Sequence, residues 1–235
     1  MDQLLVALDV DTPSEARALS DSLRGVVGGF KIGSRLFTSQ GPSIVEMLAG
    51  HGDRVFLDLK FHDIPTTVAG AVAAATRLGA SMVNVHASGG QAMMRAARDA
   101  AGEEATRMSR PVPLVVAVTM LTSLSQLMLT EIGINEAMAT QVERLARLTQ
   151  TAGLDGVVAS PREIALIRRR CGPQFIIVTP GIRGGVEAKG DQNRTMSGPE
   201  ALAAGASYLV VGRPIITAPD PRAAAERLVA ECRAS

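Results

Sequence analysis

The 235-residue sequence has few aromatic side chains: five Phe, one Tyr and no Trp. Many proteins that bind single-stranded nucleic acid stack the bases on aromatic rings, so this scarcity argues against such a platform. An excess of one charge is also missing, because 24 Lys and Arg stand against 23 Asp and Glu, a formal net charge of +1. Proteins that bind nucleic acid or anionic membranes usually carry a clear basic excess. We therefore expect no nucleic-acid partner and no membrane partner.

Cysteine and histidine are equally scarce. The two cysteines, Cys171 and Cys232, lie far apart and form no Cys-x-x-Cys pair. His51, His62 and His86 lack the spacing of metal ligands. This pattern favours two reduced thiols over a disulfide or a zinc site.

No segment has the character of a leader or a membrane span. The first residues, Met1-Asp2-Gln3, offer no basic region, and Asp9 and Asp11 follow the first apolar run. Residues 111–130 are uncharged and long enough to cross a bilayer, but they include two prolines and only one compact apolar run, residues 114–118. We expect a buried strand followed by a polar loop there, and a cytoplasmic protein.

The residues that are present indicate a globular fold with an aliphatic core. Hydrophobic residues make up 46% of the chain and charged residues 20%, which excludes intrinsic disorder. The length suits one large domain or two small ones, and α/β barrels often reach it as one domain. No linker or shift in composition marks a second domain.

Eight short apolar runs recur along the chain, and each is followed by a helix-like segment. At the first one, Thr12 is a good helix N-cap, Pro13 suits the first helical position and Glu15 the first turn. The expected strands are residues 4–8, 29–33, 55–60, 82–86, 114–119, 156–160, 175–180 and 208–212. The clearest expected helices are residues 68–78, 91–101, 139–152 and 222–233.

The spacing of these runs predicts parallel strands. Their starts are about 29 residues apart on average, close to the roughly 30 that a strand–helix–strand unit needs. Runs such as Ile176-Ile177-Val178 are continuously apolar, as in strands that are buried on both faces. Eight such units predict a single-domain (β/α)8, or TIM, barrel over residues 1–235. An open, doubly wound sheet is the alternative.

Reactive side chains cluster where the expected strands end, which is where barrel enzymes place their active sites. These side chains are Asp9, Lys31, Asp58, Lys60, His86, Thr119, Ser160, Arg183 and Arg213. Any one of them, His86 or Ser160 for example, could be an ordinary residue at a strand end.

The segment Phe56-Leu57-Asp58-Leu59-Lys60-Phe61-His62-Asp63 is the most informative. Alternation along a strand places Asp58 and Lys60 on one side, and buried charges need partners or a function. With Lys31, Asp9 and Asp63 they would form a group of three carboxylates and two lysines. A structural ion-pair network is one reading, and an array that tunes a lysine for proton transfer is the other.

The last two units point to an anionic ligand. The run Gly212-Arg213-Pro214-Ile215 follows an apolar strand and could open a short helix, where backbone N–H groups and the arginine would suit a phosphate. Residues 182–197 include Arg183 and Gln192 among several glycines. This segment is either a solvated surface loop or a lid that closes over the ligand.

These motifs resemble one known family. Residues 58–67, Asp-Leu-Lys-Phe-His-Asp-Ile-Pro-Thr-Thr, resemble the signature of the orotidine 5'-phosphate decarboxylases of bacterial type. Matching blocks follow in family order over nearly the whole chain. They are Leu8-Asp9, Phe30-Lys31-Ile32-Gly33, Val118-Thr119-Met120-Leu121-Thr122-Ser123, Thr179-Pro180-Gly181-Ile182-Arg183, Gly190-Asp191-Gln192 and Val211-Gly212-Arg213-Pro214-Ile215. One departure is Thr66, where the family often has Asn.

The resemblance implies loss of CO2 from orotidine 5'-phosphate to give UMP, the last step of pyrimidine nucleotide synthesis, with no cofactor and no metal. It assigns Lys60 as the proton donor and places Asp58 near the substrate carboxylate. Lys31 and Asp63 would complete a Lys-Asp-Lys-Asp array. Carboxylates beside Lys60 favour its charged form, which a proton donor requires.

The resemblance also implies a homodimer, in which Asp63, Ile64 and Thr67 come from the second subunit. Asp9 and Lys31 would hold the ribose hydroxyls. Ser123, beside Thr122, resembles the pyrimidine-binding position. The phosphate and lid contacts would come from Arg183, Gln192, Gly212 and Arg213. Thr122 and Pro180 are further substrate-binding positions.

Two alternatives stay open. The Asp-x-Lys-x-x-Asp core is shared with related sugar-phosphate enzymes, so a metal-dependent 3-keto-hexulose-phosphate decarboxylase or synthase is one of them. A non-catalytic barrel that binds a phosphorylated ligand is the other, although a binding module has no need for a second inward lysine.

Overall fold

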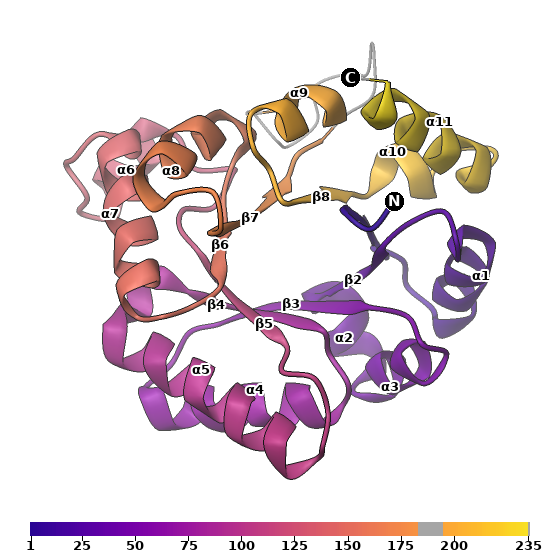
Figure 1. The fold of residues 1–235 in the computed structure, drawn as a ribbon, viewed down its shortest axis with the longest axis horizontal. Helices are drawn as coiled ribbons and strands as arrows, with labels where there is room; N and C mark the ends of the chain where they lie inside the picture. The colour runs from indigo at the N-terminus through magenta and orange to yellow at the C-terminus, as the bar shows by residue number, and fades with distance from the viewer. Residues whose placement is uncertain (183–194, 235) are drawn as a thin grey trace.

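The eight expected strands form a closed parallel barrel in the computed structural model, which describes residues 1–182 and 195–234 (Figure 1). Each strand pairs with the next in sequence, and β1 closes the barrel by pairing with β8. The strands are β1 (Leu4–Ala7), β2 (Gly29–Gly33), β3 (Val55–Phe61), β4 (Met82–His86), β5 (Leu114–Val118), β6 (Gly156–Val158), β7 (Ile176–Pro180) and β8 (Tyr208–Val211). The predicted (β/α)8 barrel is confirmed, and the open sheet is excluded.

The helices form a ring outside the strands (Figure 1). They are α1 (Pro13–Leu23), α2 (Ser34–Gln40), α3 (Ser43–Gly50), α4 (Pro65–Arg77), α5 (Gly90–Arg107), α6 (Gln126–Glu131), α7 (Met138–Thr151), α8 (Ile164–Cys171), α9 (Gly198–Ala203), α10 (Arg213–Ile216) and α11 (Pro221–Arg233). Two 3₁₀ turns, η1 (Ala87–Gly89) and η2 (Pro161–Glu163), follow β4 and β6. The four helices expected from periodicity are all present.

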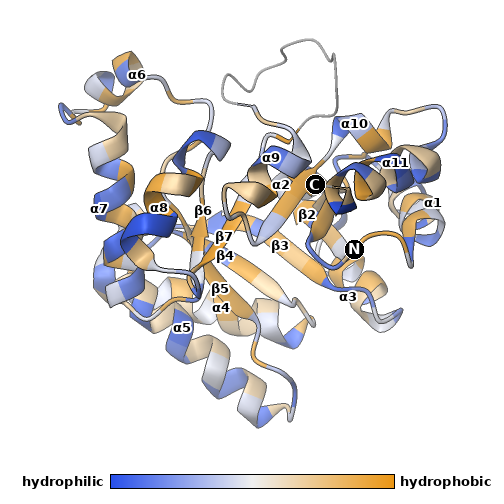
Figure 2. Cartoon of the chain, turned by 45° about the horizontal axis from the view of Figure 1, so that its top comes forward, coloured by the Kyte–Doolittle hydropathy of each residue, from blue (hydrophilic) through white to orange (hydrophobic). Residues whose placement is uncertain are grey.

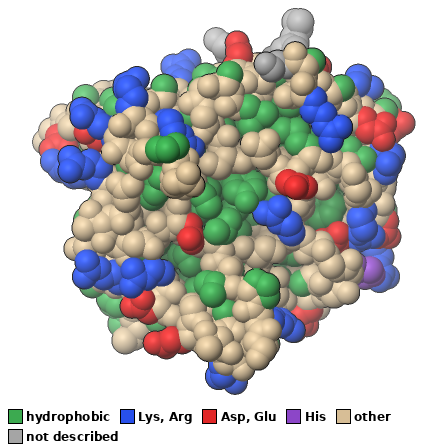
Figure 3. Space-filling view, viewed as in Figure 1, with side chains coloured by type: hydrophobic (Ala, Val, Ile, Leu, Met, Phe, Trp, Pro, Cys, Tyr) green, Lys and Arg blue, Asp and Glu red, His purple; other side chains and the backbone are tan. Residues whose placement is uncertain are grey.

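Two apolar layers explain why the strand sequences are continuously hydrophobic. Alternate residues such as Leu5 and Phe56 point into the barrel, while Leu4, Val6 and Leu57 pack outward against the helices. Both faces of the strands are therefore largely removed from water, as in other parallel sheets covered by helices, except at the end of β3, where residues 58–61 are partly exposed. Figure 2 shows hydrophobic strands inside helices of mixed character, and Figure 3 shows hydrophobic side chains at the centre of the ring.

The first helix begins as its sequence predicts. The Thr12 hydroxyl accepts from the Glu15 backbone N–H, and the Glu15 carboxylate accepts from the Thr12 backbone N–H. Pro13 occupies the first turn, where its missing N–H costs nothing. This reciprocal capping stabilises the helix by about 1 kcal/mol and fixes where the loop after β1 ends.

The uncharged segment 111–130 is a buried strand, a loop and a short helix. β5 is followed by residues 119–125 and then by α6, whose N-cap hydroxyl is that of Ser125. The expected loop is thus shorter than predicted, because Ser125 starts a helix within it. Across residues 1–182 and 195–234, no helix has the length and apolar character needed to cross a membrane. Cys171 on α8 and Cys232 on α11 are free thiols.

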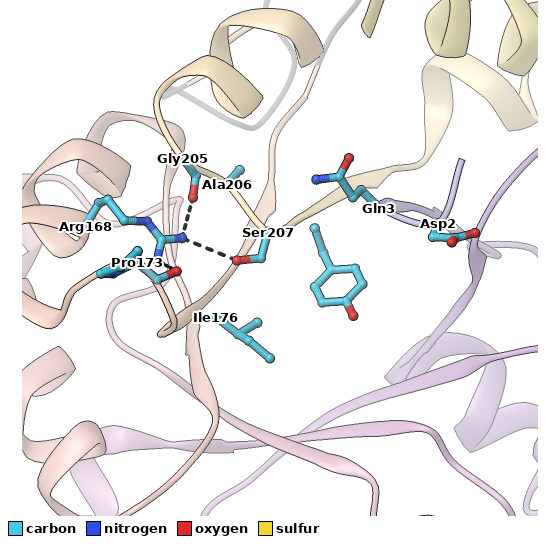
Figure 4. A pocket seen from close by; sticks show the side chains of 9 residues that line it. Asp2, Gln3, Arg168, Pro173, Ile176, Gly205, Ala206 and Ser207 are labelled. Atoms are coloured by element: carbon cyan, nitrogen blue, oxygen red, sulfur yellow. Dashed lines mark hydrogen bonds between the residues drawn. The ribbon is translucent and has the colours of Figure 1, made fainter. Parts of the chain in front are cut away.

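The N-terminal end of the barrel is held by an arginine from α8. Arg168 donates to the carbonyl oxygens of Gly172, Pro173 and Phe175, each at 2.8 Å, and to that of Gly205 at 2.5 Å. This arginine lies beside a hollow of about 480 Å³ that Asp2, Gln3 and Ser207 also line (Figure 4). The network ties the loop before β7 to the loop before β8.

Candidate active site

A cavity of about 520 Å³ opens at the carboxyl ends of the strands. Its size is typical of pockets that bind small molecules. The structure brings eight of the predicted site residues to its lining: Asp9, Lys31, Asp58, Lys60, Thr122, Pro180, Gly212 and Arg213. These residues come from both ends of the sequence, and only closure of the barrel places them together.

Asp58 lies between two lysines at the base of this cavity. Its Oδ2 is 3.2 Å from the Lys31 ammonium, and its Oδ1 accepts from the Lys60 ammonium at 2.6 Å. The Lys31 ammonium also lies 3.5 Å from Asp9 Oδ1. A side chain at Gly33 would crowd Lys31, because a Cβ there would lie 3.1 Å from Nζ. Four of the five charges that the sequence placed in one group therefore meet within one chain: Asp9, Lys31, Asp58 and Lys60. Asp63, the fifth, is not among them.

Asp58 remains ionised although it is almost buried. Its side chain is 12% exposed, and burial alone would raise the pKa of the carboxyl. The positive charges of Lys31 and Lys60, with hydrogen bonds from Lys60 and Asn84, outweigh that effect and hold the pKa of Asp58 below its ordinary value. The two lysines thus sit against a fixed negative charge at neutral pH.

Lys60 has a strained backbone. Its φ is +53°, in the left-handed region that side chains with a Cβ seldom occupy. The pairing of β3 with β4 shifts register between Leu57 and Phe61, and Lys60 lies within that irregularity. Such a conformation costs about 1–2 kcal/mol and is found most often at functional sites. Leu57 and Leu59 nevertheless pack outward, as alternation predicted, while Asp58 and Lys60 face the cavity.

Asn84 on β4 belongs to the same site, and sequence reasoning missed it. Its side-chain amide donates to Asp58 Oδ1 at 2.7 Å, and its amide oxygen accepts from the Lys60 backbone N–H at 2.8 Å. The side chain is fully buried. The signal available in the sequence was a single amide among the apolar residues of this strand. It lies two positions before His86, and therefore on the same face of the strand.

Two histidines flank the array. The His62 and His86 rings lie with their centroids 5.3 Å apart. Burial lowers the pKa of His86, and the charges of His62 and Lys60 lower it further against the opposing effect of Asp58. The neutral form of His86 is therefore favoured, which avoids a third cation beside Lys31 and Lys60.

Comparison with known proteins shows the family of this chain. Residues 2–228 match the model of the orotidine 5'-phosphate decarboxylase / HUMPS family. The chain is 54% identical, over 98% of its length and 92% of the relative's, to a Moorella thermoacetica protein named orotidine 5'-phosphate decarboxylase. It is 52% identical to the protein of that name from Syntrophotalea carbinolica, over 99% of this chain and 96% of the relative.

A crystal structure of orotidine 5'-phosphate decarboxylase from Lactobacillus acidophilus superposes with a TM-score of 0.87 and 36% identity, covering 99% of both chains. This chain belongs to the orotidine 5'-phosphate decarboxylase / HUMPS family. The resemblance noted in the sequence is confirmed.

The three residues expected to act across a dimer lie together at the start of α4. Asp63, Ile64 and Thr67 are exposed, and the Asp63 carboxylate accepts from the Ile64 backbone N–H at 2.6 Å. Among residues 1–182 and 195–234 no ion pair of Asp63 is seen, so one chain does not bring Asp63 into the array. The Ile64 side chain is 64% exposed.

The residues that the sequence analysis assigned to a phosphate are described only in part. Gly212 and Arg213 line the cavity beside Pro180, and residues Arg213–Ile216 form the short helix that the sequence predicted. Arg183 and Gln192 lie outside the described residues. Thr122 lines the cavity, whereas the neighbouring Ser123 is exposed and does not.

Some reactive residues at strand ends have structural roles. The Thr119 hydroxyl donates to the Val158 carbonyl, and Ser160 is buried at the start of η2.

Arg35, which sequence reasoning did not single out, lines the cavity and forms an ion pair with Asp11 at 2.6 Å. Within the described parts of the chain, no group of three His, Cys, Asp or Glu side chains could hold a metal ion.

Proposed function

We propose that this protein decarboxylates orotidine 5'-phosphate to UMP without a cofactor, with Lys60 as the proton donor. The observation that carries the proposal is Asp58, held between the ammonium groups of Lys31 and Lys60 at the base of the cavity. Relatives of the same family at about 50% identity carry the name of this activity.

The reaction requires a positively charged group next to the ring carbon that loses CO2. When the bond to the carboxylate breaks, its electron pair stays on that carbon and CO2 leaves. The Lys60 ammonium then delivers a proton to the carbon and becomes a neutral amine. A ring carbanion without a Schiff base or metal is poorly stabilised in water, so the enzyme must supply a large share of the ~8–23 kcal/mol that enzymes remove from barriers.

Asp58 would act on the substrate carboxylate. In our proposal this carboxylate lies against Asp58 in the ground state, and its negative charge moves toward the ring carbon and Lys60 as CO2 forms. Repulsion is thereby relieved in the transition state, while the attraction to Lys60 grows. Interactions that improve only on approach to the transition state raise kcat.

The distant parts of the substrate supply binding energy. We assign Asp9 and Lys31 to the ribose hydroxyls and Thr122 and Ser123 to the pyrimidine. Gly212 and Arg213 would bind the phosphate, with Pro180, Arg183 and Gln192 completing the phosphate and lid contacts. Arg213 can offer a planar pair of donors that matches phosphate geometry.

The active unit is proposed to be a homodimer, in which Asp63, Ile64 and Thr67 complete the site of the partner subunit. The exposed apolar surface of Ile64 and the position of Asp63 outside the array support this arrangement. Mixing inactive Lys60→Ala and Asp63→Ala dimers tests it. Subunit exchange should restore activity, because one site of each mixed dimer then carries neither change; an inactive mixture in which exchange is verified would refute a shared site.

We place the protein at the last step of pyrimidine nucleotide synthesis, in the cytoplasm. The competing function is that of a metal-dependent 3-keto-hexulose-phosphate enzyme. The Lys31 ammonium already bridges Asp9 and Asp58, where a cation would otherwise balance these carboxylates. That observation favours the metal-free reaction.

One assay separates the two functions. The purified protein is incubated with orotidine 5'-phosphate in EDTA, and the loss of the orotate absorbance is followed. Full turnover in EDTA is expected. Turnover that requires magnesium, or that occurs only with a 3-keto-hexulose phosphate, would reject the proposal.

A further inference from the structure

The buried amide of Asn84 joins the two groups on which the proposed reaction depends. It contacts the backbone of Lys60 and the carboxylate of Asp58, and it comes from the neighbouring strand. Asn84 does not line the cavity and is fully buried. Any influence on the reaction must therefore pass through these two partners.

The first contact replaces a missing bond of the sheet. β3 and β4 pair regularly at Phe56 and Leu57, and the register then shifts before Phe61. At Lys60 the backbone N–H donates to the side-chain oxygen of Asn84 instead of to a strand carbonyl. Buried backbone groups are costly to leave unpaired, so this bond helps to hold Lys60 at its positive φ.

The second contact fixes the rotation of the Asp58 carboxylate. Its Oδ2 faces Lys31, while Oδ1 accepts from both Lys60 and Asn84. Bonds at both oxygens oppose rotation of the carboxylate as the Lys60 ammonium loses its proton.

The two partners also fix the orientation of the amide. A backbone N–H can only donate and an ionised carboxylate can only accept, so the oxygen of Asn84 must face Lys60 and its nitrogen must face Asp58. The asparagine amide supplies one acceptor and one donor here without adding charge. Aspartate would keep the acceptor and bring a second negative charge against Asp58, and leucine would remove both bonds at similar volume.

We propose that Asn84 is a positioning residue, which holds the Lys60 backbone and the Asp58 carboxylate in the geometry that proton transfer requires. This inference rests on the proposed function, because it concerns the same array. It differs from a purely structural role in predicting an effect on kcat that exceeds any effect on substrate binding.

The test compares Asn84→Leu and Asn84→Asp with wild type and with Thr149→Val. The control removes a buried hydrogen bond on α7, that of the Thr149 hydroxyl to the Leu145 carbonyl. We expect kcat of Asn84→Leu to fall by about 100-fold, the scale of a 1 Å misplacement, with KM and UMP affinity changed less than about threefold. Thr149→Val should lose thermal stability and keep its kcat.

The aspartate variant adds a pH readout. Its new carboxylate would lie against Asp58, which itself contacts Lys31 and Lys60, with His86 two residues further along β4. The like charges of Asp58 and this carboxylate disfavour ionisation of both together. The acid limb of its kcat profile should move to higher pH than that of wild type. Unchanged kcat in both variants, or a rise in KM alone, would overturn the positioning role.

A crystal structure of Asn84→Leu keeps this test separate from that of the function. We expect Lys60 to leave φ near +53° and its ammonium to move away from Asp58 Oδ1. If both stay in place, the inference is wrong whether or not the wild type decarboxylates orotidine 5'-phosphate. If they move while the wild type is inactive with that substrate, the proposed function fails and the positioning of Lys60 by Asn84 stands.

Discussion

The two ends of the barrel use partly buried cations in opposite ways. At the amino ends of the strands, Arg168 donates to four backbone carbonyls, which are fixed and neutral. At the carboxyl ends, Lys31 and Lys60 face carboxylates and an open cavity. A positive charge therefore holds two loops together at one end of the barrel and faces the ligand cavity at the other.

The difference lies in the partners. The loop carbonyls accept hydrogen bonds from Arg168 only while the loops are folded. These hydrogen bonds therefore contribute to the free energy of unfolding. The ion pairs at the cavity contain charges that can form new contacts with a bound substrate. One of them, that of Lys60, also depends on a strained backbone. Removal of Arg168 should thus alter stability, and removal of Lys31 or Lys60 should alter activity.

The largest expected effect is that of Lys60→Ala. Loss of the proton donor should reduce kcat by at least about 10⁴-fold, because both acid catalysis and charge stabilisation disappear. Nucleotide binding, measured by titration calorimetry with UMP, should be largely kept. Near-normal turnover in this variant would refute the proposed mechanism.

A second effect at the cavity concerns the phosphate. Arg213→Ala should weaken binding of UMP, by about 10-fold or more, while binding of uridine changes little. Titration calorimetry with both ligands measures the difference. Equal losses for UMP and uridine would remove Arg213 from the phosphate site.

Arg168→Leu should show the reverse pattern. Four carbonyls lose a charged donor, and we expect the free energy of unfolding to fall by about 2–3 kcal/mol in urea titrations. The kcat of the folded fraction should equal that of wild type. The exposed neighbour Arg169 provides the matched control Arg169→Leu, which should leave stability nearly unchanged; a loss of kcat in Arg168→Leu would contradict the division between the two ends.

His86 should make stability depend on pH at the carboxyl end. Its pKa is lowered in the folded chain, mainly by burial. As the pH falls through 6.5, His86 takes up a proton in the unfolded chain before it does so in the folded chain. The free energy of unfolding should therefore decrease between pH 6.5 and the lower pKa of His86 in the folded chain. Unfolding titrations between pH 7.5 and about 5 should show a shallower slope in His86→Gln. His51→Gln should keep the wild-type slope, since His86 is still present in it.

The smallest expected effect is that of Tyr208→Phe at the amino end. The change removes one hydrogen bond, from Arg54 to the phenol oxygen at 3.0 Å, and leaves the ring under the guanidinium. A loss of about 0.5–1 kcal/mol is expected in urea titrations. A loss as large as that of Arg168→Leu would show that the amino end depends on this contact as well.

Much of the fold could be predicted from the sequence, because apolar runs, turn residues and caps are local signals. The predicted strand 55–60 ends one residue before the observed one, and Thr12 caps α1 as expected. Asp58 and Lys60 could be assigned to one face from alternation alone.

The rest depends on contacts between strands that no local pattern records. The bond of Asn84 to Lys60 joins residues 24 positions apart in the sequence, and it exists only because β3 and β4 are out of register there. The positive φ of Lys60 has the same origin. The Arg168 network joins two loops before β7 and β8, so its acceptors could not be identified from α8.

Closure of the barrel has a consequence for synthesis of the chain. β1 pairs with β8 through contacts such as Leu5 with Val210, so the first strand keeps an open edge until nearly the whole protein has been made. Pairings this distant in sequence form slowly, and open edges invite association with other chains. A nascent chain that stops before β8 already carries Lys31, Asp58 and Lys60 but lacks Arg213 and a closed sheet. Translation pauses in the last unit should therefore favour aggregation over partial activity.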